Sequence, residues 1–327
     1  MELSKPELKE LVHRVVVAQG NSFIKELLRD SGTRIGVTKE DFASNLDAAI
    51  DEEVITQGKL EAWLAEVEGW GDQHLYLFQP PEIDAAALAN GIAASSHAGV
   101  LGSSASLDFP DGLELKHIRL GDVGLSMEWH QSKEGWNRWK PKDFIVEEEH
   151  ERFRFDAYRQ RFDRSVVRYE WRFGDGYCAI LIHRNPEIDH DAVLVDIHAA
   201  LVVIGCPNVP FVKITLSQAV KVAARDDRGV HSTRFELDSG YVEMASTLAE
   251  GGIESVEAVR GVLRAVDASQ FDRAQGMLHF VSEEHGTSRR IAVQVYGSEG
   301  RLRIWAQCKR EDVFKIVELL WGYNNEA

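Results

Sequence analysis

The sequence predicts an α+β protein, with an N-terminal antiparallel helical bundle followed by a mostly antiparallel sheet with flanking helices. Two observations lead to this class. Apolar side chains recur at helical spacing in the first seventy residues, whereas from Leu113 onward apolar and polar side chains alternate at strand period. We expect residues 1–72 to form the bundle, residues 73–110 a connecting strand and a small-residue linker, and residues 111–327 the α+β domain.

Four short helices are expected in the bundle, because residues that favour helix N-caps precede each apolar repeat. Ser4 with Glu7 matches a capping box, and Asn21, Thr38 and Thr56 are suited to cap the next three helices. Short connections between amphipathic helices favour antiparallel neighbours. Two roles stay open for this bundle: an interaction module, or a cap packed onto the rest of the protein.

The segment from residue 89 to residue 106 consists almost entirely of small side chains. Such a composition is typical of a flexible linker. The segment lacks the phosphate-loop pattern, so a ligand loop is the weaker interpretation. The apolar run His74–Phe78 is expected to form a strand, and the domain boundary is placed between Gln79 and Pro110.

Antiparallel strands dominate the predicted body. Residues 113–120 and 123–130 are expected to pair as a hairpin, and the segment Glu128–Phe144, dense in tryptophan and cations, to form the loop after it. Helices and further strands follow in the prediction. The helices are expected at residues 189–204, 216–225, 253–266 and 311–321, and the strands within residues 230–247, 276–283, 289–296 and 301–308.

The most strongly patterned stretch is residues 152–182. Val167 and Tyr169 fall on one face of a strand, and Arg168 and Arg172 fall on the other. A Gly-Asp-Gly turn is then expected to reverse the chain into a buried return strand. The apolar face should contact the core, and the arginine face should be open to solvent or to a ligand.

The order of elements in the body suggests an internal duplication, with residues 111–206 and 207–327 as the two copies. In each copy two strands joined by a glycine-containing turn lead through a pair of basic residues into a helix with an acidic start. Such a duplication would give a pseudo-twofold body with a long curved sheet. Coincidence is the alternative, because the identity between the copies is weak.

The composition is that of a globular chain able to bury a core, with 44% hydrophobic and 28% charged residues. No apolar run has the length of a membrane helix, and the N-terminus lacks the pattern of a signal peptide. Cys178, Cys206 and Cys308 are widely spaced in apolar stretches, which favours reduced core thiols and a cytoplasmic location. The net charge of −16 argues against a surface that binds nucleic acid all over.

Basic and aromatic residues nevertheless form the main candidate site. The proposed ligand-binding residues are Trp136, Arg138, Trp139, Lys140, Arg152, Arg154, Arg168 and Arg172. Arginine pairs with phosphates and carboxylates through parallel hydrogen bonds, and tryptophan stacks on bases. We therefore expect an anionic ligand: nucleic acid, a nucleotide or an acidic protein. The alternative is a solvated strand face, because the glutamates within residues 147–151 can neutralise the arginines.

The segment His183–His198 is the second candidate, because it is rich in histidine and aspartate. His190 and His198 are two turns apart on the expected helix, too far to share an ion directly, and Asp189 is explained by helix capping. No HExxH, GxSxG, Rossmann or phosphate-loop motif is present. The sequence therefore indicates no cofactor and assigns no metal site.

These observations favour a non-enzymatic, cytosolic binding or adaptor protein without membrane contact. The helical bundle would contact a protein partner or a second copy of the chain, and the Trp/Arg face would bind an anionic ligand such as nucleic acid. Two alternatives stay open: a metal-assisted hydrolase that uses the segment His183–His198, and a scaffold that binds neither metal nor polyanion.

Overall fold

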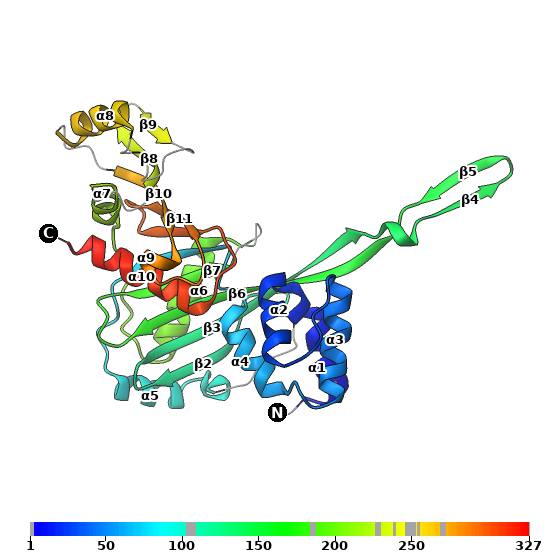
Figure 1. Cartoon of the computed structure of the whole chain (residues 1–327). Helices are drawn as coiled ribbons and strands as arrows, with labels where there is room; N and C mark the ends of the chain where they lie inside the picture. Colours follow the sequence, from blue (N-terminus) through cyan, green and yellow to red (C-terminus); the bar gives the residue numbers. More distant parts are fainter. Residues whose placement is uncertain are drawn as a thin grey trace.

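The computed structural model describes residues 3–102, 109–183, 188–225, 230–237, 240–245, 253, 256–268 and 273–326. The α+β class is confirmed. A ten-stranded antiparallel sheet crosses the molecule, helices pack against it, and a separate two-stranded ribbon projects to one side (Figure 1).

The strand order places an early segment of the chain at the centre of the sheet. The order is β2 (Glu114–Gly121), β3 (Gly124–Arg138), β6 (Tyr158–Arg172), β7 (Cys178–His183), β1 (Gln73–Phe78), β12 (Arg301–Ile304), β11 (Ile291–Tyr296), β10 (Arg273–Phe280), β8 (Val230–Leu237) and β9 (Gly240–Ala245). Strand β1 is therefore hydrogen-bonded to β7 on one side and to β12 on the other. It is a central strand of the sheet, and the predicted division into domains stays a prediction.

Most strand predictions in the body are confirmed. Strands β2 and β3 form the predicted hairpin, and β7 is the buried return strand. Strands β8 to β12 lie within a few residues of their predicted positions. The predicted turn at residues 238–239 lies outside the described residues. The internal duplication stays a prediction.

Further helices, which follow the N-terminal region in the chain, flank the sheet. They are α5 (Ala85–Ala94), α6 (His190–Val203), α7 (Ser217–Arg225), α8 (Glu257–Ala268), α9 (Ser282–His285) and α10 (Arg310–Asn324), with 3-10 turns η2 (Ala98–Val100) and η3 (Lys140–Lys142). Helices α6, α7, α8 and α10 occupy the positions that the apolar spacing predicts.

Strand β1 is buried on both faces. Leu75 and Leu77 belong to one apolar cluster with residues of α7 and α10, whereas Tyr76 and Phe78 belong to a second cluster with residues of α5 and α6. Successive side chains of a strand point to opposite faces, so this one strand contributes to two cores. The sheet is covered by helices on both sides at this point.

Four helices fill the first part of the chain. They are α1 (Lys5–Arg14), α2 (Asn21–Asp30), α3 (Lys39–Asp51) and α4 (Gln57–Val67), with a 3-10 turn η1 (Val16–Ala18). They share a third apolar cluster that includes Leu11, Ile24, Phe42 and Leu60. A role for these helices as an interaction module stays a prediction.

The predicted caps are found at three of these helices. Ser4 precedes α1 in a capping box, and the side chains of Thr38 and Thr56 accept hydrogen bonds from the first turns of α3 and α4. The prediction for Asn21 is wrong by one position, because α2 begins at Asn21 and Gly20 is the residue before it. Glycine is also accepted at a helix N-cap.

The segment predicted as a flexible linker is partly helical. Helix α5 includes residues 89–94, and the Asp84 carboxylate caps it by accepting from the Ala87 N–H at 2.8 Å. Leu88 and Ile92 of α5 are fully buried. Alanine has the highest helix propensity, and these two apolar anchors are enough to hold the helix on the sheet. Residues 103–108 of the predicted linker lie outside the described residues.

Helix α5 approaches the end of α6 very closely. A Cβ atom added to Gly91 would lie 2.0 Å from the carbonyl oxygen of Ile204. This approach requires a residue without a side chain. By contrast, a Cβ atom at Gly58 in α4 would meet nothing within 4 Å.

An arm leaves the sheet through β3 and β6 (Figure 1). These two strands pair along their whole length, with Gly124 opposite Arg172 at one end and Arg138 opposite Tyr158 at the other. The ribbon of β4 (Phe144–Glu148) and β5 (Glu151–Phe155) lies beyond them. Residues 133–163 are named the arm below. The prediction of a loop at Glu128–Phe144 is wrong, because β3 continues through Arg138. A ribbon exposed on both faces lacks the apolar alternation by which strands are recognised.

Candidate functional site

Most of the predicted ligand-binding residues lie on the arm. Trp136 and Arg138 come from β3, Trp139 and Lys140 from the turn that follows it, and Arg152 and Arg154 from β5. Arg168 and Arg172 lie instead in the body of the sheet, on β6. The eight residues are therefore divided between two environments.

The arm exposes large aromatic side chains. Trp136, Trp139 and Tyr158 are 61%, 41% and 54% exposed. Further along, the rings of Phe144 and Phe155 stack with centroids 4.9 Å apart while both side chains stay exposed. Aromatic residues of this size are normally buried, and exposed groups of them mark interaction surfaces.

Arg138 is engaged within the arm itself. Both terminal nitrogens of its guanidinium donate to the Asp143 carboxylate, and one lies 2.6 Å from Asp156. The hydrogen bonds with Asp143 raise the pKa of Arg138, and the hydrogen bond from Arg138 holds the pKa of Asp143 below its usual range. Arg138 therefore positions the segment between β3 and β4.

Arg152 and Arg154 are held more loosely. Arg152 pairs with Glu147 at 3.3 Å, and Arg154 pairs with Asp156 at 2.9 Å, in side chains that are largely exposed. Exposed ion pairs contribute on the order of 0–1 kcal/mol. These two arginines can therefore exchange their present carboxylates for an external anion at little cost.

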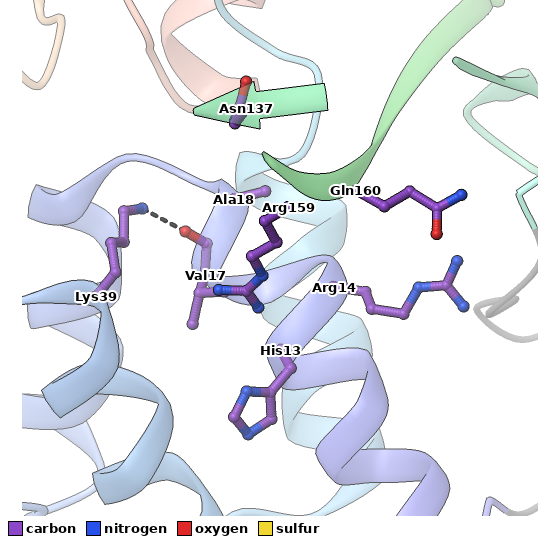
Figure 2. Close-up of a pocket in the computed structure, with 8 residues that line it drawn as sticks. All are labelled: His13, Arg14, Val17, Ala18, Lys39, Asn137, Arg159 and Gln160. Atoms are coloured by element: carbon purple, nitrogen blue, oxygen red, sulfur yellow. Dashed lines mark hydrogen bonds between the residues drawn. The ribbon is translucent and has the colours of Figure 1, made fainter. Parts of the chain in front are cut away.

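A basic cavity of about 400 Å³ lies at the foot of the arm. Figure 2 shows His13 and Arg14 of helix α1, Lys39 of α3 and Arg159 of β6 around it. The remaining lining residues are Val17, Ala18, Asn137 and Gln160. None of these described lining residues carries a carboxylate, although His13 lies 2.8 Å from Asp47 and Arg14 lies 2.9 Å from Glu10.

The cations of this cavity differ in how they are held. The Lys39 ammonium donates to the backbone oxygens of Val17 and Gln19, and Arg14 forms an exposed ion pair with Glu10 at 2.9 Å. Arg159 lies with its guanidinium 5.5 Å from the centre of the Trp139 ring. Arg159 thus links the cavity to the aromatic residues of the arm.

A polar layer lies under helix α4 on the body of the sheet. Arg168 is 3% exposed and donates from Nε to Glu128 at 2.8 Å, and its guanidinium lies 4.5 Å from the centre of the Trp70 ring. Beside it, Arg164 donates to the buried Glu68 at 2.7 and 2.8 Å. Arg168 therefore does not lie on an open face, contrary to the expectation from the strand pattern.

Burial alone would raise the pKa of Glu128. The charge of Arg168 and the hydrogen bond with His130 outweigh this effect and hold the pKa of that carboxyl well below its usual range. Glu170 lies two positions after Arg168 on β6. Burial raises the pKa of Glu170, although Ser126 donates a hydrogen bond to its carboxylate at 2.8 Å. Arg172, near the end of β6, is exposed and lies 4.0 Å from the centre of the Phe314 ring.

The histidines of the second candidate segment are separated. His183 is half-buried at the end of β7, His190 Nδ1 hydrogen-bonds to the Tyr76 hydroxyl at 2.7 Å, and His198 Nε2 lies 2.7 Å from the carbonyl oxygen of Val209. Burial lowers the pKa of both His183 and His190. In the part of the chain that the structure describes, these histidines do not converge on a metal position. Residues 184–187 lie outside it.

No protein-family model matches this chain, and no curated protein matches its sequence. Among the described residues, no helix combines the length and the apolar character required to cross a bilayer. The arrangement of the side chains of this protein is therefore the basis for a proposal about its function.

Sequence patterns could not have found the basic cavity. Its cations come from helices α1 and α3 and from strand β6, more than a hundred residues further along the chain. On the helices, Arg14 and Lys39 look like ordinary polar-face residues. Only the packing of the first helices against the foot of the arm brings them together.

Proposed function

We propose that this chain is a non-enzymatic, cytosolic nucleic-acid-binding protein that uses the arm and the basic cavity at its foot. The observation that carries the proposal is the combination of exposed aromatic rings and loosely paired arginines on the arm with a cavity wall that bears cations and no carboxylate.

A two-stranded ribbon has a suitable shape for this task. The major groove of duplex DNA admits a β-ribbon, and exposed aromatic rings provide stacking faces for unpaired bases. Trp136, Trp139 and Tyr158 lie between the body of the sheet and the ribbon of β4 and β5. Arg152 and Arg154, toward the far end, would follow the phosphate backbone.

The cavity would hold a phosphate group beside the arm. Arg14 and Arg159 supply guanidinium groups, which suit phosphate geometry, and Lys39 adds a further positive charge. The net charge of −16 repels nucleic acid from the rest of the surface. Binding would therefore be confined to this region, and an acidic protein that binds the same residues is an outcome of the test.

Helices α1 to α4 would take part in two ways. Helices α1 and α3 contribute Arg14 and Lys39 to the cavity, and the outer surface of the bundle would contact a protein partner or a second copy of the chain. The body formed by residues 111–206 and 207–327, whose duplication is a prediction, would act as the rigid support of the arm. The metal-assisted hydrolase has weaker support, because His183, His190 and His198 each have a separate environment.

Fluorescence anisotropy with labelled single-stranded and duplex oligonucleotides, at about 50 and 200 mM salt, tests the proposal. Trp136→Ala/Trp139→Ala should weaken binding by about 1–3 kcal/mol for each base that stacks on these rings. Arg14→Ala/Arg159→Ala should weaken binding to all sequences and lower the slope of log K against log salt by about two.

The matched control is Arg260→Ala/Lys315→Ala, which removes an exposed cation from helix α8 and a half-exposed one from helix α10. It should leave both the affinity and the salt dependence unchanged. The proposal fails if the wild-type protein does not bind at low salt, or if the control weakens binding as much as the cavity variant does. Binding of polyglutamate without binding of oligonucleotides would instead indicate an acidic protein partner.

A further inference from the structure

Two histidines and a glutamate converge beside the polar layer of the sheet. His117, Glu128 and His130 each offer one potential ligand atom, and these atoms lie within 4.8 Å of one another. His117 is 4% exposed and His130 is 2% exposed, and Glu128 is partly buried. This is the only such group among the described residues.

The register of β2 and β3 creates this cluster. His117 lies directly opposite Glu128, and His130 follows two positions later on the same face of β3. A register shift between Leu115 and His117 makes this alignment possible. Irregular positions of this kind are used to re-aim side chains near functional sites.

One nitrogen of this cluster has no partner. His130 Nε2 lies 2.8 Å from Glu128 Oε1, whereas His130 Nδ1 is buried without a hydrogen-bond partner among the described residues. An unsatisfied buried polar atom costs about 1–3 kcal/mol. The side chains present therefore leave one hydrogen-bonding position of this ring open, and Nδ1 is free to carry the ring proton if Nε2 binds another group.

A cavity of about 360 Å³ opens on the cluster. His117, Glu128 and His130 line it together with Glu61 and Glu68 of the α4 region. Two imidazoles and one carboxylate are a donor set that binds zinc and related ions while leaving a position for water. Arg119, Arg164 and Arg168 line the same cavity, and Arg164 pairs with Glu68, so the charges of the surrounding carboxylates are balanced by arginines.

We propose that His117, Glu128 and His130 bind a divalent transition-metal ion of the zinc class, with its remaining coordination position open to the cavity. The ion would take the place of the proton between His130 Nε2 and Glu128 Oε1, and the displaced proton would move to His130 Nδ1. Arg168 keeps its hydrogen bond to the other carboxylate oxygen, Oε2. This site is independent of the nucleic-acid proposal and lies outside the segment His183–His198.

Metal analysis of the full-length protein, purified without chelator, is the first part of the test. About one equivalent of zinc or a related metal per chain is expected. After the metal has been removed, titration with Co²⁺ should give a saturable visible absorption band, because bound cobalt reports its ligand geometry. His117→Ala and His130→Ala should each lower the cobalt affinity by tenfold or more.

His198→Ala is the matched control, because His198 is a histidine bonded to a backbone carbonyl in the other histidine-rich segment. It should keep the metal and the cobalt spectrum. Circular dichroism checks the fold of each variant, and His117→Gln, which retains a polar side chain of similar size, replaces any alanine variant that does not fold. The absence of stoichiometric metal together with no saturable cobalt band overturns the proposal, as does equal loss of metal in His198→Ala.

Discussion

Replacing Arg168 by alanine separates a structural role of the β6 arginines from a ligand-binding role. The side chains of Arg168 and Glu128 are 4% and 12% exposed, and both Nε and Nη2 of Arg168 lie 2.8 Å from Glu128 Oε2. Without Arg168, the Glu128 carboxylate would remain buried and lose its cationic partner. Removing one partner of a buried ion pair costs about 3–5 kcal/mol, and this is the loss of unfolding free energy that we expect for Arg168→Ala.

Urea denaturation followed by circular dichroism measures this loss, with a chelator present so that bound metal does not contribute. Arg172→Ala is the control, because Arg172 lies on the same face of the same strand but is exposed. Its contact with the Phe314 ring predicts a loss of about 1 kcal/mol or less. The pair Glu128→Gln/Arg168→Met, which removes both charges, should recover most of the stability that Arg168→Ala loses.

The structural interpretation would be refuted by an Arg168→Ala protein as stable as Arg172→Ala. It would also be refuted if Arg168→Ala lowered oligonucleotide affinity while the urea midpoint stayed unchanged, because Arg168 would then contact the ligand. If Arg168→Ala and the double variant Glu128→Gln/Arg168→Met lost the same stability, the unpaired Glu128 carboxylate would not be the cause of the loss.

Gly91→Ala should lower the free energy of unfolding by about 1–3 kcal/mol, because the added Cβ would overlap a carbonyl oxygen. Gly58→Ala should raise the free energy of unfolding by up to about 1 kcal/mol, because Gly58 has open space around it. Urea titrations of the two variants measure both changes. Acid titration of stability tests Glu128. Because the folded-state pKa of Glu128 is depressed, its contribution to stability is complete above the unfolded-state pKa of about 4.3 and is lost as the pH falls through the lower folded-state pKa. Below about pH 4, the stability of Glu128→Gln should therefore depend less steeply on pH than that of the wild-type protein. Burial raises the pKa of Cys178 to about 12 and that of Cys206 to about 11, so a thiol reagent should react slowly with the native protein and rapidly after unfolding; fast reaction of native thiols would contradict this.

Local signals in the sequence predicted much of the fold. Thr38 and Thr56 mark helix starts because their hydroxyl groups bond to backbone N–H groups within the next turn, which requires no knowledge of the rest of the chain. The position of β1 could not be predicted in this way. Its pairing with β12 joins distant segments, and nothing within Gln73–Phe78 specifies that partner.

The candidate sites were harder to predict for the same reason. Trp136 and Trp139 stand out in the sequence as aromatic residues among cations, but Arg14 joins them only through the packing of α1 against the arm. The alternation of Glu128 and His130 is visible in the sequence. Their approach to His117 depends on a register shift that the residues of β2 do not reveal.

The central position of β1 has a consequence for the synthesis of the protein. As the chain leaves the ribosome, β1 can pair with β7, but its other neighbour is made only near the end. His74 and Arg301, which hydrogen-bond across these two strands, are 227 residues apart. Until β12 emerges, one edge of an apolar strand stays unpaired, and such edges promote aggregation. A chain that ends before Arg301 would keep this edge open permanently, so we expect such a fragment to aggregate more readily than the full chain.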